Sequence, residues 1–203
     1  MRTFVAVFAL VAAAVLSLAA QAGRAPGSRV STDSQCAADL GTGVKSKRRF
    51  CDVIVSAVPA ESVTVPLPAR TGTATLLFDL HNRFTVPVVT GQPLLAYQRH
   101  EAVVTVIRPN GVVISKAAAI REFRATTDLF DLIAGGGRPG GYKAIAPGPA
   151  ESIRVAIPAG LTSVGITGLR LSVRTSAAGP EVFDTPGRPV AILSNVRVEY
   201  RPR

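Results

Sequence analysis

The sequence predicts an all-β protein: an antiparallel β-sandwich of the jelly-roll or immunoglobulin-like type with one short helix, preceded by a cleaved signal peptide. Three observations support this prediction. Apolar and polar residues alternate with a period of two along most of the chain after residue 50. The 15 prolines and 18 glycines divide this pattern into roughly eight to ten short strands. The apolar share of 47% is typical of a globular chain rather than a disordered one.

The first 22 residues contain the three parts of a secretory signal peptide. Arg2 gives a positive start, residues 4–20 form an apolar run, and Ala20-Gln21-Ala22 is a cleavage pattern. We expect cleavage after Ala22 and export to the periplasm or the medium. The alternative is an uncleaved anchor, but this run is shorter than the roughly 20 residues that a transmembrane helix needs. After cleavage we expect no transmembrane span.

The remaining chain is divided into an extended basic leader or loop, residues 23–49, and a single β-sandwich domain, residues 50–203. Export would place Cys36 and Cys51 in an oxidising compartment, so we expect them to form a disulfide that ties the leader to the first strand. Closing a loop of this size stabilises a fold by about 3 kcal/mol. A reactive thiol or a metal site is the alternative, and it is disfavoured because no histidine lies nearby.

The alternating pattern locates the strands, and one segment departs from it. Thr126-Thr127-Asp128 offers a helix N-cap, and the apolar residues that follow have helical spacing until Gly135, so we predict one short helix there. Pro109-Asn110-Gly111 is a strong turn signal. The predicted strands lie within residues 51–57, 63–67, 74–80, 104–106, 112–114, 153–157, 169–173 and 190–200.

A weak internal repeat relates residues 59–69 to residues 149–159. Two interpretations are open. The two segments are either halves of a duplicated sandwich or two edge strands with the same turn–strand–proline arrangement. We favour edge strands, since proline within sheets is confined largely to edges and strand ends.

Two histidine-containing segments are the candidates for chemistry. Asp79, His81 and Arg83 fall on one side of a strand, where a carboxylate could orient an imidazole as a base or as a metal ligand. His100 and Glu101 form the other segment, and a two-histidine, one-carboxylate metal site would need both segments to meet. The competing and favoured interpretation is a solvated polar strand end. We assign these five residues to a candidate ligand-binding site and predict no catalytic residue, no metal and no cofactor.

The net charge of +10 includes a compact basic run formed by Lys45, Lys47, Arg48 and Arg49. A basic surface attracts anionic partners, so an anionic glycan, an envelope surface or an acidic protein face is the expected partner. Nucleic acid is disfavoured by the expected compartment and by the scarcity of aromatic stacking residues. The alternative is that the positive charge reflects the overall amino-acid composition, in which arginine outnumbers lysine 19 to 4, rather than a binding surface.

The sequence lacks a Gly-x-Ser-x-Gly nucleophile elbow and a phosphate-binding loop. We therefore predict an exported, non-catalytic binding module, with residues 82–92 and 135–142 as its most distinctive loops. One alternative is a structural or assembly protein that pairs through edge strands. A less favoured alternative is a metal-assisted hydrolase that uses His81 and His100.

Overall fold

The structure is a computed structural model that describes residues 28–83, 98–123, 128–134, 142–175 and 179–203. The signal peptide predicted over residues 1–22 and most of the loops at 82–92 and 135–142 lie outside these residues. Among the residues that are described, no helix is long and apolar enough to cross a membrane.

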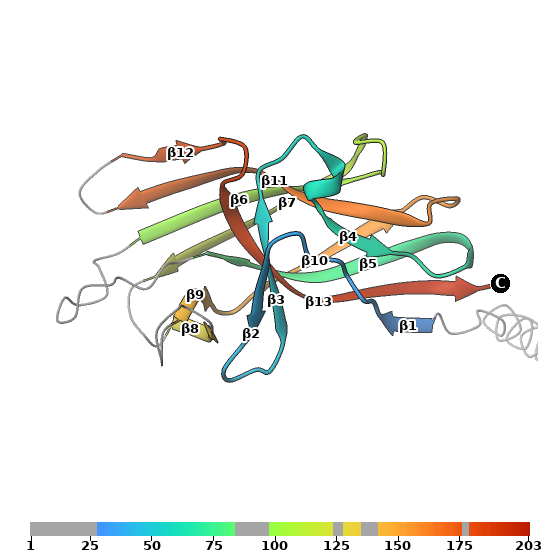
Figure 1. The fold of residues 1–203 in the computed structure, drawn as a ribbon, viewed down its shortest axis with the longest axis horizontal. Coiled ribbons are helices and arrows are strands. Elements are labelled where there is room, and N and C mark those ends of the chain that lie inside the picture. Colours follow the sequence, from blue (N-terminus) through green and yellow to red (C-terminus); the bar gives the residue numbers. More distant parts are fainter. Residues whose placement is uncertain (1–27, 84–97, 124–127, 135–141, 176–178) are drawn as a thin grey trace, which may run out of the picture.

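Two antiparallel sheets pack face to face, so the prediction of an all-β sandwich is confirmed (Figure 1). Sheet A has the order β10-β5-β13-β3-β2, with β1 also paired to β13, and sheet B has the order β12-β11-β6-β7, with β4 also paired to β11. The strands of sheet A are β1 (Ser28–Ser31), β2 (Asp39–Thr42), β3 (Arg49–Ile54), β5 (Arg70–Asn82), β10 (Glu151–Ile157) and β13 (Pro189–Pro202). Those of sheet B are β4 (Val63–Pro66), β6 (Gln98–Ile107), β7 (Val113–Phe123), β11 (Ser163–Thr175) and β12 (Glu181–Phe183).

The main core lies between the sheets and is built by the alternation that the sequence shows. In β5, for example, Leu76, Phe78 and Leu80 face the core, while Asp79 and His81 point to the opposite side of sheet A. Strands of sheet B contribute the facing layer, which includes Ala102, Val104, Val106, Val164, Ile166 and Leu171.

A bulge in β13 changes which residues face the core. The pairing of β13 with β5 shifts between Ser194 and Arg197, and Asn195 has a positive φ of 56°. Before the bulge Leu193 faces the main core, and after it Val196 does. The single alternating face predicted over residues 190–200 is therefore wrong, because the extra residue reverses the side on which side chains lie.

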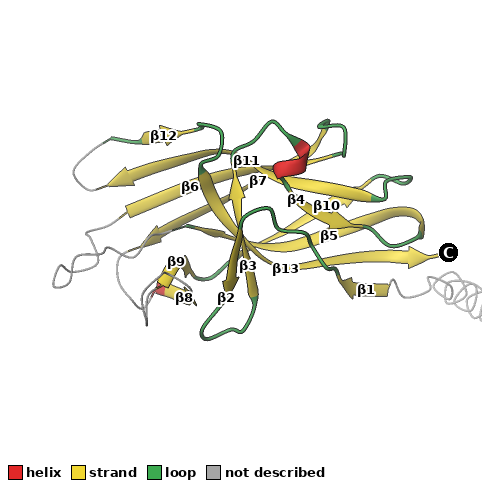
Figure 2. Cartoon of the chain, in the orientation of Figure 1, coloured by secondary structure: helices red, strands yellow, loops and turns green. Residues whose placement is uncertain are grey.

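The short helix predicted after residues 126–128 is also wrong. Residues 129–134 form strand β8 (Leu129–Ala134), which pairs with β9 (Tyr142–Pro147). Pairing with the next strand along the chain and burial of Ile133 in a core override the local helical spacing. The helical element drawn in red beside β4 in Figure 2 is the 3-10 turn η1 (Pro59–Glu61).

The segment predicted as a leader contributes two strands to sheet A. β1 pairs with the end of β13, and β2 pairs with β3. Cys36 and Cys51 form the predicted disulfide, with their Cα atoms 5.8 Å apart. The bond joins the chain before β2 to the buried side of β3.

The two similar segments at 59–69 and 149–159 occupy corresponding positions in opposite sheets. β4 from the first segment pairs with β11, and β10 from the second pairs with β5. Each edge strand therefore pairs with the long strand that follows the other segment. Both lie at the margins of their sheets, an arrangement that fits edge strands and a duplicated sandwich equally.

Candidate functional site

A small second core covers the face of sheet A that points away from sheet B. The antiparallel pair β8–β9 lies over this face (Figure 1). Residues from sheet A and from this pair are buried together there, and they are Leu40, Phe50, Ile133, Ala146 and Ile192. The β8–β9 pair thus covers part of this face of sheet A, and apolar and polar side chains lie together beneath it.

Asp79 is the centre of a polar network beside this second core. Its Oδ2 accepts hydrogen bonds from Arg48 Nη1 at 3.0 Å and from Asn195 Nδ2 at 2.8 Å, while its Oδ1 accepts one from Ser152 Oγ at 3.2 Å. A buried carboxylate needs such donors, since an unpaired charge out of water is costly. Asp79 therefore fixes groups from β10, from β13 and from the loop before β3.

His81 lies inside the second core rather than at a solvated strand end. Its ring centroid is 5.8 Å from that of Phe50 and 5.1 Å from that of Phe130, and its Nε2 is 3.1 Å from Ser194 Oγ. His81 and Ser194 are only 0% and 2% exposed. Both side chains are buried, so their contact satisfies polar groups within the packing.

The basic loop between β2 and β3 is held in place by Asp131 of β8. The Asp131 carboxylate accepts backbone N–H bonds from Lys45 at 2.9 Å, from Ser46 at 2.7 Å and from Leu132 at 2.8 Å. Burial alone would raise the pKa of Asp131. The hydrogen bonds from the Ser46 side chain and from these backbone groups outweigh burial, and the pKa is lowered. Asp131 is thus a charged anchor for the loop.

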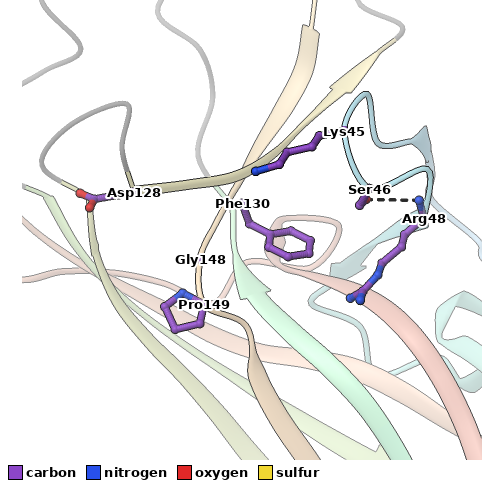
Figure 3. Close-up of a pocket in the computed structure, with 7 residues that line it drawn as sticks. All are labelled: Lys45, Ser46, Arg48, Asp128, Phe130, Gly148 and Pro149. Atoms are coloured by element: carbon purple, nitrogen blue, oxygen red, sulfur yellow. Dashed lines mark hydrogen bonds between the residues drawn. The ribbon is translucent and has the colours of Figure 1, made fainter.

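A pocket of ≈ 630 Å³ opens between this loop and the β8–β9 pair. Figure 3 shows the Phe130 ring at its centre, with Lys45 and Arg48 on one side and Asp128 and Pro149 on the other. The Arg48 guanidinium lies 5.4 Å from the centroid of the Phe130 ring, within cation–π range. The pocket therefore offers an aromatic surface, two cations and one carboxylate. Its complete lining is Lys45, Ser46, Arg48, Asp128, Phe130, Gly148 and Pro149.

The four cations of the basic run have different surroundings. Arg48 pairs with Asp79, and Arg49 Nη2 lies 2.9 Å from Asp39 Oδ2. Lys45 and Lys47 are exposed, and no ion pair joins either of them to an acidic side chain of the described residues. Half of the run is therefore compensated locally, so the patch is less positive than the sequence indicates.

Arg83 and His100 meet at one end of the sandwich, together with Asp52. Arg83 Nε lies 2.8 Å from Asp52 Oδ1. Burial raises the pKa of Asp52 to about 6, although Arg83 opposes the shift. Burial likewise lowers the pKa of His100 to about 4, against a hydrogen bond to the backbone of Arg83. Two ionisable groups with pKa values shifted in opposite directions thus share one arginine.

The structure does not bring His81 and His100 together. They lie on different sheets, in β5 and β6, and Glu101 faces Arg170 of β11 at 3.7 Å. Within the described residues, no group of three or more His, Cys, Asp or Glu side chains is placed to hold a metal ion. The five candidate residues from the sequence therefore divide among three surroundings: the second core, the sandwich end and the outer face of sheet B.

Sequence reasoning missed three contributors to the pocket and its support. Phe130 and Asp131 were assigned to a helix, and Asn195 was placed within a regular strand. A signal for Asp131 is present, since a lone acid within an apolar run requires a partner. The Asn195 bulge has no comparable signal in the sequence.

Comparisons with models of protein families, with curated proteins and with solved structures find no match to this chain.

Proposed function

We propose that this chain is an exported, non-catalytic binding module whose ligand is an acidic sugar. The pocket that contains Lys45, Arg48, Asp128 and Phe130 is the observation that carries the proposal. The Phe130 ring, which Arg48 and His81 also contact, offers apolar contact to the C–H groups of a sugar ring, and a carboxylate accepts hydrogen bonds from hydroxyl groups. An ammonium group pairs with an acidic substituent.

The charge of the pocket favours a sugar with one negative charge per ring. Lys45, Arg48 and Asp128 line the pocket, and Arg48 is already paired with Asp79, so Lys45 is the cation left to pair with an acidic ligand. A densely sulfated polymer would meet Asp128 as a repulsive group. A uronic acid places one carboxylate among several hydroxyls, and this mixture matches the cationic, acidic and aromatic lining.

A non-catalytic role is supported by the complete burial of His81, which is the partner of Ser194 in the one serine–histidine pair seen in this core. Export to the periplasm or the medium is supported by the pattern of the first 22 residues and is compatible with the Cys36–Cys51 disulfide. Fractionation of cells that express the full chain, with sequencing of the mature amino terminus, tests the export step.

Calorimetric titration with galacturonic acid tests the ligand class, with galactose as the neutral control. We expect saturable binding of the acid and a loss of about tenfold in affinity for Lys45→Ala, as removal of a hydrogen bond to a charged group predicts. Lys116→Ala removes an equal charge from an exposed position of β7 and should bind normally. Phe130→Leu keeps apolar volume but loses the flat ring, so it should also bind more weakly.

Two results would contradict this proposal. Failure of galacturonic acid and of other uronic acids to bind would exclude acidic sugars as the ligand. Equal losses for Lys45→Ala and Lys116→Ala would show attraction by net charge rather than recognition in the pocket.

Assembly through an edge strand is the second candidate function, and β7 is the strand that favours it. It ends the order of sheet B, and Val113 and Ile120 are 50% and 41% exposed. Part of this strand is already engaged, because Asn82 Nδ2 donates to the Ala119 carbonyl at 3.0 Å. Sedimentation that shows a concentration-dependent dimer, lost in Ile120→Lys, would favour assembly, whereas a monomer at all concentrations would exclude it.

A further inference from the structure

Arg48 also lines a second cavity. It has a volume of ≈ 260 Å³, and its lining includes Asp33, Arg49, Ser194 and Asn195 as well as Cys51 of the disulfide. Arg48 lines both this cavity and the pocket that contains Phe130. The two cavities are therefore neighbours that share one side chain.

The two cavities contain the same kinds of charged group in their linings. The first contains Lys45, Arg48 and Asp128, and the second contains Arg48, Arg49 and Asp33. Because Arg48 is common to both, the two linings together have three cations and two carboxylates, and two of the cations, Arg48 and Arg49, also pair with Asp79 and Asp39. A polymer with one negative charge per repeating unit would meet the Lys45 ammonium in the first cavity and a guanidinium in the second.

Arg48 and Arg49 keep donors for a ligand although each pairs with an aspartate. A guanidinium has five N–H donors, and the ion pair with Asp79 uses Nη1 of Arg48, while that with Asp39 uses Nη2 of Arg49. The pairing also fixes the direction of each guanidinium, which lowers the entropic cost of binding.

One buried carboxylate positions a lining residue of each cavity. Asp79 Oδ2 accepts from Arg48, which lines both cavities, and from Asn195, which lines the second. The bulge at Asn195 directs its amide toward Asp79. The boundary between the cavities is thus a supported part of the fold rather than a loose surface side chain.

We infer that the ligand is an oligomer of acidic sugars, with successive units in the two cavities and Arg48 between them. This inference rests on the proposed function and extends it from one ring to at least two. Linking two bound units makes the second binding event intramolecular, so affinity should rise steeply from monomer to dimer.

Calorimetry on the full chain with galacturonic acid monomer, dimer and trimer tests this inference. The dimer should bind at least about tenfold more tightly than the monomer, with one dimer per chain. In Arg49→Ala the ratio of dimer to monomer affinity should fall toward one, whereas in Lys116→Ala the ratio should stay as in the wild type. Arg49 and Asp39 form an exposed pair, so the fold should tolerate the change, which thermal unfolding can verify.

The outcomes separate this inference from the proposed function. If the monomer binds in a Lys45-dependent way but the dimer binds no more tightly, the two-cavity ligand is wrong and the single-ring site stands. Two monomers per chain with no gain for the dimer would show two independent sites, which also overturns the inference. If no acidic sugar binds, both the inference and the proposed function fail.

Discussion

Arg48 donates from Nη1 to Oδ2 of Asp79 at 3.0 Å, and this bond ties the basic loop to the outer face of sheet A. The exposed pair between Arg49 and Asp39 has nearly the same length, 2.9 Å. The two acids differ in exposure, since the Asp79 side chain is 9% exposed and that of Asp39 is 44% exposed. Burial rather than distance should therefore decide what each acid contributes to stability.

Asp79→Asn should lower the free energy of unfolding by about 1–3 kcal/mol, because three donors lose their charged acceptor. Asp39→Asn should cost less than about 1 kcal/mol, as is usual for a solvated pair. Urea denaturation of both variants measures the difference. Equal losses would show that the Asp79 network adds no more than a surface ion pair.

Gly43 lies where the basic loop leaves β2, close to Asp131 and Phe50. A Cβ atom there would overlap the Asp131 carboxylate and lie 2.7 Å from Cε2 of Phe50. Gly43→Ala should therefore destabilise the fold by about 1–3 kcal/mol, as overpacking usually does, and should weaken ligand binding by displacing Lys45. Thermal unfolding and calorimetry measure the two effects.

Gly179→Ala is the matched control, since a Cβ at Gly179 meets no atom within 4 Å. This variant should unfold and bind like the wild type. If Gly43→Ala did the same, contact with Asp131 and Phe50 would not be what holds the loop.

Reduction of the Cys36–Cys51 disulfide tests its contribution without changing any other side chain. Cys51 is buried in the main core, and Cys36 packs against it. The sequence separation of 15 residues corresponds to about 3 kcal/mol in the chain-entropy model. The urea midpoint in dithiothreitol should fall accordingly, and an unchanged midpoint would show that the bond adds no stability.

The sequence predicted those features that depend on local alternation. In β5 and β10 the period of two continues without interruption, so Leu76, Phe78, Val155 and Ile157 face the core as expected. The disulfide was also predictable, because two cysteines in an expected oxidising compartment leave a single intramolecular pairing.

The sequence did not predict features that depend on distant partners. Asp131 becomes an anchor only because β8 lies beside the loop at Lys45 and Ser46, 86 and 85 residues away. Ser194 falls within the alternating strand predicted over residues 190–200, but the bulge at Asn195 separates it from the face to which Val196 belongs. Local patterns identify neither partner, and the candidate pocket depends on both contacts.

Asp52 and His100 predict an unusual pH dependence of stability. Their ordinary pKa values are 3.8 and 6.5, and the fold changes them to about 6 and about 4. Between pH 3.8 and 6 folded Asp52 holds a proton that the unfolded chain releases, so its contribution to the free energy of unfolding falls as pH rises. Between pH 4 and 6.5 the unfolded chain binds a proton at His100 that the folded chain lacks, so this contribution rises with pH.

The two contributions oppose each other over the same window, and single variants should separate them. Relative to the wild type, Asp52→Asn leaves the His100 contribution, so stability should fall more steeply on acidification from pH 6.5 to 4. His100→Gln leaves the Asp52 contribution. On acidification from pH 6 to 3.8 the free energy of unfolding of this variant should therefore rise relative to that of the wild type. Urea denaturation across this range gives the slope of the free energy of unfolding against pH for each protein. The other titrating groups are common to all three proteins, so they do not account for differences between the slopes. Slopes that shift in the same direction in both variants would show that Asp52 and His100 are not the opposing pair.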